Sequence, residues 1–432
     1  MLLMRGAWRT TWLLLAFMVV NFADKAVLGL AGPEIRADFG ITRQEFGTAQ
    51  SAFFALFSVA ALGVSALTKR VRTTPLLLGL ALLWSAAQLP MLWGAAGFGA
   101  LVATRVLLGA AEGPASPVAM HHVHGWFPQR ERALPTALLL VGAAAGVAVA
   151  APALSWVITH WGWRWSFGAV GLVGLVWAAV WFLWGKEGPL APSVGKEAEQ
   201  TPQDSFTVPL RRILLSPTFL TAAFGSFAAY WSMSATLTWA PDYMENVMGW
   251  NLHQASTMVG AGAVAHGAVL LVHGLLARRS ALRGTPPRLP VGAGAGLLVA
   301  LSGCATALFG LSDSQAVKVP MMLGPMALAM VMLTVAATAC SRIAPPVQRG
   351  TVLGVLTCVY ALGGIVSPLV LGRLVDGAAT VSAGYEHGWL LTAALLVAGG
   401  VLAAVFCRPE RTAGQLGVPE TPAALPAHQV TP

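Results

Sequence analysis

Residues 10–32 read TTWLLLAFMVVNFADKAVLGLAG, an apolar run that carries Asn21, Asp24 and Lys25 in its second half. A run of this length crosses about 30 Å of hydrocarbon as a helix. An ionised side chain at the centre of a bilayer costs at least about 2.5 kcal/mol, so such residues usually face a cavity and serve a function. The stretch therefore predicts a membrane helix with a functional polar face.

Similar apolar runs recur along the chain, which is 56% hydrophobic and 10% charged over 432 residues. Soluble domains carry about 25% charged residues. Because lipid admits only helices or closed barrels, and these runs are too long for barrel strands, the sequence predicts an all-α multi-pass membrane protein. Twelve spans are predicted, at 10–32, 45–68, 75–95, 97–122, 133–157, 165–185, 216–244, 255–277, 289–311, 317–342, 351–376 and 387–407.

A polar stretch at 186–215 divides the spans into two groups of six. It is predicted to be a cytoplasmic linker between an N-terminal half, 1–185, and a C-terminal half, 216–407. The tail, 408–432, is rich in Pro, Thr and Ala and is predicted to be a disordered cytoplasmic segment. The first span is interrupted by polar residues, so we expect it to be retained rather than cleaved as a signal peptide.

The formal net charge of +9 does not indicate a nucleic-acid partner, because the basic residues concentrate in alternate short loops. This is the positive-inside pattern, which places both termini in the cytoplasm. The four cysteines lack metal-site spacing, and the sequence contains no P-loop, dinucleotide or zinc motif. We therefore expect a monomeric, non-enzymatic protein without a metal or cofactor.

Asp24 and Glu112 are interpreted as the two acids within the spans, and Lys25 and Arg105 as their basic partners. Arg105 and Glu112 are seven residues apart, so they lie on nearly the same helix face, about 10 Å apart. Asn21, Asp24 and Lys25 form one polar stripe. A carboxylate that loses its cationic partner in a low dielectric takes up a proton, which predicts proton carriers. Alternatively, these residues are structural ion pairs that hold the first and fourth spans together.

Several motifs resemble the anion:cation symporter family of the major facilitator superfamily. Residues 21–25, NFADK, resemble its Asn-Tyr-x-Asp-Arg signature, and residues 104–114, TRVLLGAAEGP, resemble its Arg-Phe-Leu-x-Gly-x-x-Glu-Gly/Ala-Pro run. Residues 126–132, WFPQRER, are similar to its Trp-Phe-Pro-x-x-Glu-Arg loop, and 162–165 and 362–368 also fit. The resemblance implies the major facilitator fold, with twelve helices in two six-helix halves and a substrate cavity between them.

The resemblance also implies cotransport of a small organic anion with protons, by alternating access, in a bacterial inner (plasma) membrane. By position in the motifs, Asp24 and Glu112 are expected to carry protons, and Lys25 to hold the substrate carboxylate. Arg105 is expected to gate the coupling by pairing with the acids. Two other functions remain open: a proton-driven efflux antiporter, and a sensor that binds an anion without transporting it.

The chain departs from the family pattern at residues expected to line the cavity. Lys25 replaces an arginine and lacks its planar fork. Phe22 and Phe57 stand where sugar-acid transporters tend to carry tyrosine, and Ala61 and Ala361 replace glutamine and asparagine. A wall that cannot pair hydroxyl groups disfavours polyhydroxylated substrates. These changes predict a small, apolar or aromatic monocarboxylate rather than a sugar acid.

Further candidates lie in the C-terminal half. Tyr230 and Trp239 on the seventh span and Tyr360 on the eleventh are candidate substrate-binding residues, although aromatic side chains also suit a membrane-interface belt. His266 lies in the middle of the eighth span and is a candidate proton relay. The alternative is a histidine that hydrogen-bonds a neighbouring helix.

Overall fold

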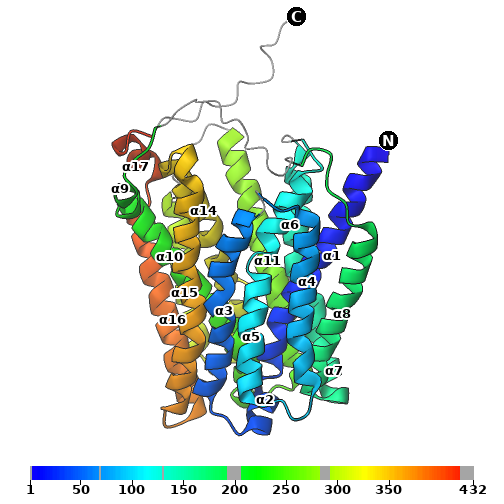
Figure 1. Ribbon diagram of the computed structural model, residues 1–432. Helices are drawn as coiled ribbons and strands as arrows, with labels where there is room; N and C mark the ends of the chain where they lie inside the picture. Colours follow the sequence, from blue (N-terminus) through cyan, green and yellow to red (C-terminus); the bar gives the residue numbers. More distant parts are fainter. Residues whose placement is uncertain (1, 68–69, 129–130, 192–205, 283–291, 419–432) are drawn as a thin grey trace, which may run out of the picture.

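The computed structural model describes residues 2–67, 70–128, 131–191, 206–282 and 292–418. All regular secondary structure within these ranges is helical. The long helices run side by side in one bundle, and the start of α1 lies at the same end as α17 (Figure 1). We call this end the terminal end and the opposite one the far end.

The N-terminal half contains the helices that correspond to the first six predicted spans. They are α1 (Leu2–Leu30), α2 (Gly32–Phe39), α3 (Arg43–Leu67), α4 (Thr73–Gln88), the 3₁₀ turn η1 (Leu89–Leu92), α5 (Phe98–Glu112), α6 (Ala115–His124), α7 (Ala133–Trp161) and α8 (Trp163–Trp184). The fourth span is divided because Gly113 and Pro114 follow α5, and proline lacks the N–H that an uninterrupted helix needs. The division places Glu112 at the last residue of α5.

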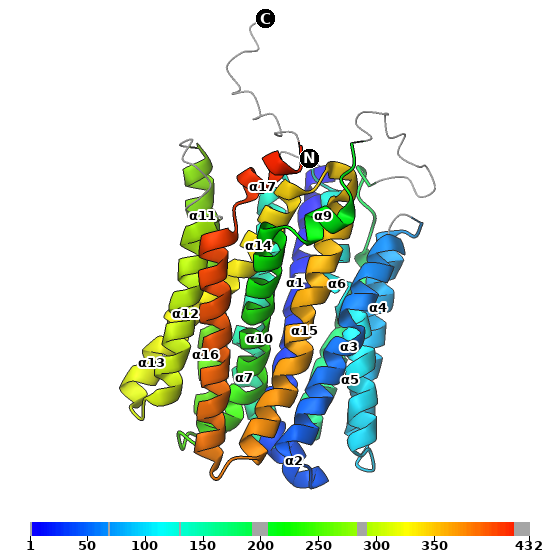
Figure 2. The same cartoon turned by 90° about the vertical axis from the view of Figure 1, so that its left-hand side faces the viewer.

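The C-terminal half begins with a short helix at the end of the linker. Its elements are α9 (Leu210–Leu214), α10 (Pro217–Asn246), α11 (Leu252–Leu282), α12 (Ala293–Leu311), α13 (Gln315–Leu323), η4 (Pro325–Met330), α14 (Val331–Ile343), η5 (Pro346–Gln348), α15 (Arg349–Asp376), α16 (Val381–Phe406) and α17 (Pro409–Gln415). In Figure 2, α11, α12, α13 and α16 lie on one side of the bundle and α3, α4 and α5 on the other. Helices α1, α10 and α15 lie between these groups.

The predicted all-α, multi-span fold is confirmed. Within the described residues, 9 helical runs are long and apolar enough to cross a membrane. Helices α3 and α10 and the α5–α6 pair occupy the other three predicted positions.

The predicted disorder of the tail is wrong for its first part. Pro409–Gln415 forms α17, which is attached to the bundle by two side-chain contacts. Arg342 on α14 pairs with Glu410 at 2.8 Å, and the hydroxyl groups of Thr218 and Thr412 lie 2.6 Å apart. Residues 419–432, and residues 192–205 of the linker, lie outside the described ranges.

The two halves touch closely through glycine. A Cβ atom on Gly29 of α1 would overlap the carbonyl oxygen of Leu237 on α10, and one on Gly47 of α3 would overlap that of Pro368 on α15. Small residues of this kind let helix backbones approach in membrane bundles. Gly29 and Gly47 belong to the far-end parts of α1 and α3, so the halves are in close contact at that end.

The terminal end has open space beside α15. An open hollow of about 390 Å³, lined by residues of α15 alone, follows this helix from Gly350 to Leu362, which is the part nearest the terminal end. The bundle is therefore closed at the far end and hollowed beside α15 at the terminal end.

Candidate functional site

Lys25 on α1 forms an ion pair with Glu112 on α5, with 2.6 Å between Nζ and Oε2. The ammonium also donates to Asn21 Oδ1 at 3.2 Å and to the Asn21 carbonyl at 3.3 Å. An ammonium group has three N–H donors, so these contacts use all of them. Another acceptor can bind Lys25 only by displacing one of these partners.

Asp24 turns to the other side of α1 and joins Arg105 through a glutamine. Gln88 Nε2 on α4 donates to Asp24 Oδ1 at 2.6 Å, and Arg105 Nη2 donates to Gln88 Oε1 at 2.5 Å. Arg105 also lies over the ring of Phe167 on α8, with 4.9 Å between its Cζ and the ring centroid. Among the described residues, no direct ion pair joins Arg105 to Asp24 or to Glu112.

The expected pairing of charges therefore differs in detail from the observed one. Arg105 was expected to pair with the acids, but it contacts Asp24 only through Gln88. The direct ion pair joins Lys25 to Glu112 across the two spans. The reason is that adjacent residues of a helix point in different directions. Asp24 therefore faces α4, and Lys25 faces α5.

The two acids are buried and interact with each other. Asp24 is 0% exposed and Glu112 is 1% exposed, and each carboxyl group lies within the electrostatic influence of the other. Within the described part of the chain, Asp24 Oδ2 and Glu112 Oε1 have no hydrogen-bond partner. A buried polar atom without a partner costs about 1–3 kcal/mol, and a proton on these oxygens would supply a donor.

Two glycines of the 104–114 motif set the position of Glu112. Gly109 and Gly113 face the carbonyl oxygens of Phe53 and Phe57 on α3, and a Cβ at either position would overlap them. The backbones of α3 and α5 therefore lie in contact. This contact places Glu112 beside the aromatic side chains of α3.

An aromatic wall, Phe53–Phe54–Phe57–Tyr230–Tyr360, extends from the charge network into the C-terminal half. Ring centroids lie 5.6 Å apart for Phe53 and Phe57, 5.6 Å for Phe54 and Tyr230, and 5.0 Å for Tyr230 and Tyr360. Phe57 and Tyr360 are only partly buried. The wall thus joins α3 to α10 and α15 and leaves two of its rings accessible.

The ammonium of Lys25 adjoins this wall. Its Nζ lies 4.1 Å from the ring centroid of Phe22 and 5.9 Å from that of Phe53, distances typical of cation–π contacts. The predicted binding residues Phe22, Lys25, Phe57, Tyr230 and Tyr360 are therefore brought together by the fold.

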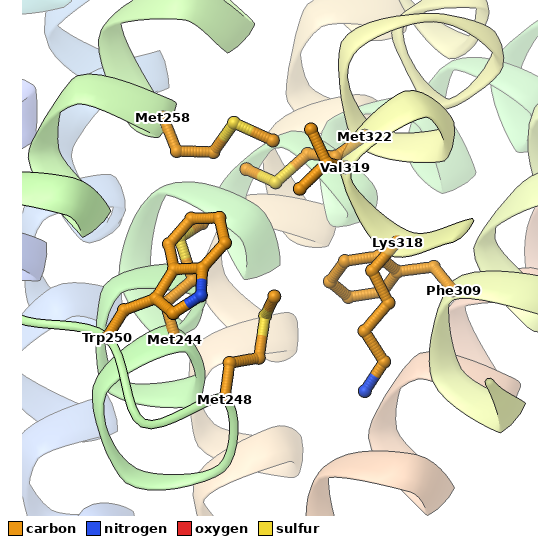
Figure 3. Close-up of a pocket in the computed structure, with 8 residues that line it drawn as sticks. All are labelled: Met244, Met248, Trp250, Met258, Phe309, Lys318, Val319 and Met322. Carbon is orange, nitrogen blue, oxygen red and sulfur yellow. The ribbon is translucent and has the colours of Figure 1, made fainter. Parts of the chain in front are cut away.

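A second pocket lies near the far end of the C-terminal half, away from this network (Figure 3). It is lined by Met244, Met248, Trp250, Met258, Phe309, Lys318, Val319 and Met322. Lys318 is 5% exposed and donates to Tyr243 Oη at 2.5 Å. Tyr243 packs against Tyr385, with 5.3 Å between ring centroids. Through these contacts the pocket supports the far-end network described next.

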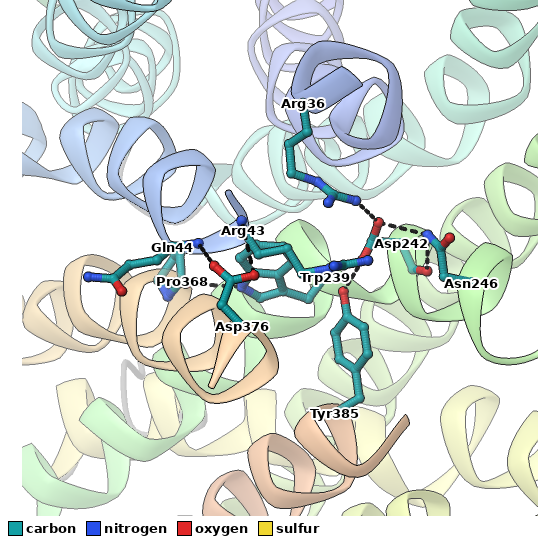
Figure 4. A network of polar contacts seen from close by, with 9 residues as sticks. All are labelled: Arg36, Arg43, Gln44, Trp239, Asp242, Asn246, Pro368, Asp376 and Tyr385. Atoms are coloured by element: carbon teal, nitrogen blue, oxygen red, sulfur yellow. Dashed lines mark hydrogen bonds and ion pairs between the residues drawn. The ribbon is translucent and has the colours of Figure 1, made fainter. Parts of the chain in front are cut away.

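Asp242 on α10 is the centre of this far-end network (Figure 4). It forms ion pairs with Arg36 of α2 and Arg43 of α3, the latter at 3.0 Å. Tyr385 of α16 donates to the same carboxylate, and Asn246 Nδ2 donates to it at 2.9 Å. Both arginines belong to the N-terminal half, so the ion pairs tie the two halves together.

Asp376, at the end of α15, provides another link at this end. It accepts hydrogen bonds from the backbone N–H groups of Arg43, at 3.3 Å, and Gln44, at 2.7 Å. A carboxylate at this position satisfies free N–H groups at the start of α3 and interacts favourably with the helix dipole. The C-terminal half thus caps a helix of the N-terminal half.

The interpretation of Asp24 and Glu112 as the two acids within the spans is wrong, because Asp242 is a further buried acid within a predicted span. It lies in predicted span 216–244 and is 2% exposed. Its arginine partners lie within α2 and at the start of α3. A buried acid among apolar residues was visible in the sequence, as was Gln88 in span 75–95.

Trp239 is not brought together with the other predicted binding residues. It is 0% exposed, and its Nε1 donates to the Pro368 carbonyl at 3.2 Å. Its ring packs against Phe46 and Tyr385. Its place is therefore in the contact between halves beside the far-end network (Figure 4), because α10 turns this face toward α3 and α15.

His266 also lies apart from the charge network. It is partly buried on α11, and it interacts with the backbone of Gly262 one turn earlier. The role of His266 as a proton relay stays a prediction. Within the described residues, no group of His, Cys, Asp and Glu has the arrangement of a metal site.

Comparisons with known proteins show the family. The model of the Major Facilitator Superfamily matches residues 13–368. The chain is 26% identical over 394 residues to a D-galactonate transporter of Escherichia coli, covering 86% of this chain and 90% of that protein. It is 25% identical to a probable sulfoacetate transporter of Cupriavidus necator, covering 90% and 91%. A hexuronate transporter of Bacillus subtilis is 29% identical over 248 residues, a match that spans 57% of its length.

Solved structures share the fold. A bacterial homologue of the human lysosomal transporter Spinster has a TM-score of 0.75 at 20% identity, covering 97% of this chain and 99% of that one. A D-xylose–proton symporter has a TM-score of 0.75 at 13% identity, covering 93% and 98%. The chain belongs to the major facilitator superfamily of multi-pass membrane transporters, and its relatives are named as transporters of organic acids.

Proposed function

We propose that this protein imports an organic monocarboxylate together with protons, by alternating access, across a bacterial inner membrane. The observation that carries the proposal is the buried ion pair between Lys25 and Glu112, beside an aromatic wall that reaches both halves. Asp24 and Glu112 carry the protons, and Lys25 binds the carboxylate.

Competition for the Lys25 ammonium couples the two ligands. All three N–H donors of Lys25 are occupied, so an incoming carboxylate must displace a partner, and in the proposed cycle that partner is Glu112. The new contact is a charge-assisted hydrogen bond. Glu112 is then a buried acid without its cation, a costly state that protonation relieves. Substrate binding therefore draws a proton into the site.

The charges of the network support the same coupling. Asp24 and Glu112 balance Lys25 and Arg105, so the buried set is neutral when all four are ionised. A bound carboxylate adds a negative charge in a region of low dielectric, and a proton cancels it. The halves can then close over a site without excess charge.

The aromatic wall favours a substrate with an apolar body. The rings of Phe22 and Phe53 lie near the ammonium, Phe57 packs against Phe53, and none of these three side chains offers a hydrogen bond to a hydroxyl group. An apolar or aromatic group gains free energy by packing on these rings. The relatives are named for hexuronate and galactonate, so the aromatic wall is the feature that separates our proposal from a sugar-acid transporter.

The arrangement of the halves supports import from the far end to the terminal end. Basic residues are abundant in the loops at the terminal end, which is the pattern of a cytoplasmic face. The far-end network is then the external gate, and the cavity beside α15 is the internal opening. On this proposal, the structure corresponds to an inward-facing state.

The proposed coupling is tested with Glu112→Gln in proteoliposomes. We expect the variant to lose accumulation of substrate driven by a pH gradient while it keeps exchange of substrate, because the amide stays neutral without a proton. Accumulation and counterflow are measured on the same preparation. A variant that still concentrates substrate against its gradient would show that Glu112 is not a coupling residue.

The substrate class is tested by thermal-shift measurements with paired carboxylates. Benzoate and phenylacetate are compared with galactonate and a hexuronate, and we expect the aromatic acids to raise Tm more. Stronger stabilisation by the sugar acids would overturn the proposed preference. Proton movement opposite to substrate movement, followed with a pH dye inside the vesicles, would instead indicate efflux by antiport.

A further inference from the structure

Gln88 is a buried amide that separates an acid from a guanidinium. It is the last residue of α4 and is 0% exposed. Its Nε2 contacts Asp24 at 2.6 Å and its Oε1 contacts Arg105 at 2.5 Å. Gly171 of α8 fixes this position further, because a Cβ there would lie 3.2 Å from Gln88 Cβ.

The two partners determine which way the amide points. A guanidinium only donates hydrogen bonds, so it requires the amide oxygen, and a carboxylate requires the amide nitrogen. The reversed amide would place N–H groups against the guanidinium. Gln88 is therefore held in one orientation between Asp24 and Arg105.

This arrangement prevents a direct ion pair between Asp24 and Arg105. A guanidinium paired directly with a carboxylate strongly favours the ionised acid. The uncharged Gln88 amide favours the ionised acid less than a directly paired guanidinium would, and the carbonyl oxygen of the neutral acid can still accept its hydrogen bond. Asp24 Oδ2, which has no partner within the described residues, is left as the position for a proton.

We infer that Gln88 is a positioning residue for proton coupling: it keeps Asp24 and Arg105 apart and so allows Asp24 to exchange a proton during each cycle. The inference rests on the proposed function, and it adds a residue of α4 to the coupling apparatus. Within the described residues, the hydrogen bonds of the Gln88 side chain go to Asp24 and Arg105, so it acts through Asp24 rather than on the substrate.

Few charged groups surround Asp24. Lys25 acts on it from the same helix, and Arg105 and Glu112 act on it from α5. The neighbouring α4 contributes Gln88, and α8 contributes the apolar ring of Phe167 beside Arg105. Changing Gln88 therefore alters mainly the relation between Asp24 and Arg105.

The first test is Gln88→Met, which keeps the length of the side chain but removes both hydrogen bonds. Arg105 can then pair directly with Asp24 and hold it ionised. We expect the pH of half-maximal proton-driven uptake to fall by at least about one unit, since an adjacent arginine favours an ionised acid to that extent. Uptake of radiolabelled benzoate and galactonate is measured in parallel, and counterflow reports the amount of folded protein.

The second test is Gln88→Glu. It tests the role of Gln88 in proton coupling even if Gln88→Met does not fold. When protonated, the introduced carboxyl group donates to Asp24 and accepts from Arg105, as the amide does. When ionised, it cannot donate to Asp24. We therefore expect coupling at acidic pH and its loss at higher pH, where the wild-type protein still accumulates substrate.

The outcomes separate this inference from the proposed function. If the wild-type protein accumulates either probe and both folded variants keep its pH profile, Gln88 is not a positioning residue and the proposed function stands. If only Gln88→Glu folds and it keeps the wild-type pH profile, the same conclusion follows: Gln88 is not a positioning residue, and the proposed function stands. If the wild-type protein accumulates neither probe in a pH gradient, the proposed function fails and the role of Gln88 fails with it.

Discussion

The molecule has two buried networks of acidic and basic residues, the charge network of the N-terminal half and the far-end network centred on Asp242. They differ in which parts of the structure they connect. The first links α1, α4 and α5 within one half. The second links the two halves through Arg36 and Arg43. A change of protonation in the first alters the charge of the site without separating helices. Loss of an ion pair in the second loosens the contact that closes the far end.

The two networks also differ in how fully their carboxylate groups are paired. Asp242 accepts from four side chains, whereas Asp24 and Glu112 each keep one oxygen without a partner among the described residues. Fully paired carboxylates rigidify a structure, and unpaired oxygens are positions where a proton or ligand can bind. We propose on this basis that the far-end network serves as a gate and the other as the coupling site.

The largest expected effect follows from removing the cation of the coupling site. Lys25→Ala leaves Glu112 without its partner and the substrate without its anchor. Truncating one member of a buried charge pair costs about 2–5 kcal/mol, so we expect uptake and counterflow to fall at least about 30-fold. Initial rates in proteoliposomes give the measurement.

Lys25→Arg is the matched control for this substitution. It keeps the charge and restores the residue that the family signature carries, so transport is expected to persist. Retention of full transport by Lys25→Ala would place carboxylate recognition elsewhere and remove the distinction between the two networks.

A smaller effect is expected from weakening the gate with Asp242→Asn. The neutral amide cannot balance Arg36 and Arg43, so the far end opens more often while the coupling site is unchanged. We expect a drop of about 10-fold in uptake, on the scale of 1.4 kcal/mol, and greater access from the far end. Access is measured by labelling Ser51→Cys with an impermeant maleimide, in a protein whose native cysteines have been replaced. Ser51 suits this measurement because it lies between the halves and donates to the Ile365 carbonyl.

Asp38→Asn is the control for the gate. Asp38 pairs with Arg164 at 2.9 Å, but its side chain is 46% exposed, and such surface pairs contribute about 0–1 kcal/mol. We expect less than a two-fold change in uptake and no change in labelling. Equal labelling of Asp242→Asn and wild-type protein would show that the Asp242 network does not hold the far end closed.

Much of the coupling site could be predicted from the sequence, and little of the gate could. Asp24, Lys25, Arg105 and Glu112 stand out because charge is rare in apolar spans and because their motifs resemble a known family. Which acid pairs with which basic residue depends on how α1, α4 and α5 are rotated about their axes relative to one another. A helix pattern gives the face of a residue but not the neighbour of that face.

The gate escaped prediction for a related reason. Asp242 has its partners about 200 residues away in sequence, at the ends of helices in the other half. Trp239 illustrates the same difficulty, since its aromatic ring suits a substrate pocket, an interface belt and a contact between halves equally well. Only the packing of α10 against α3 and α15 selects the last of these.

The smallest predicted effect concerns a carboxylate that belongs to neither network. Glu187, just after α8, accepts from the Thr74 backbone N–H at 2.7 Å and from the Thr73 hydroxyl at 3.0 Å, and so caps the start of α4. Caps of this kind contribute about 0.5–2 kcal/mol. We expect Glu187→Gln to lower Tm by a few degrees and to leave proton-driven accumulation unchanged, which would show that loss of a carboxylate alone does not uncouple transport.

The pH dependence of this effect gives a check on its cause. Burial acts to raise the pKa of Glu187, but the hydrogen bonds from Thr74 and Thr73 and the nearby His122 outweigh it, so the pKa lies below the usual value of 4.5. A lowered pKa in the folded state stabilises the protein above the unfolded value, and this contribution is lost as the pH falls through the folded value. The difference in Tm between wild type and Glu187→Gln should therefore be constant above about pH 5 and shrink below pH 4.5. A difference that persists unchanged at pH 3 would mean that the variant acts through packing rather than through the charge that caps α4.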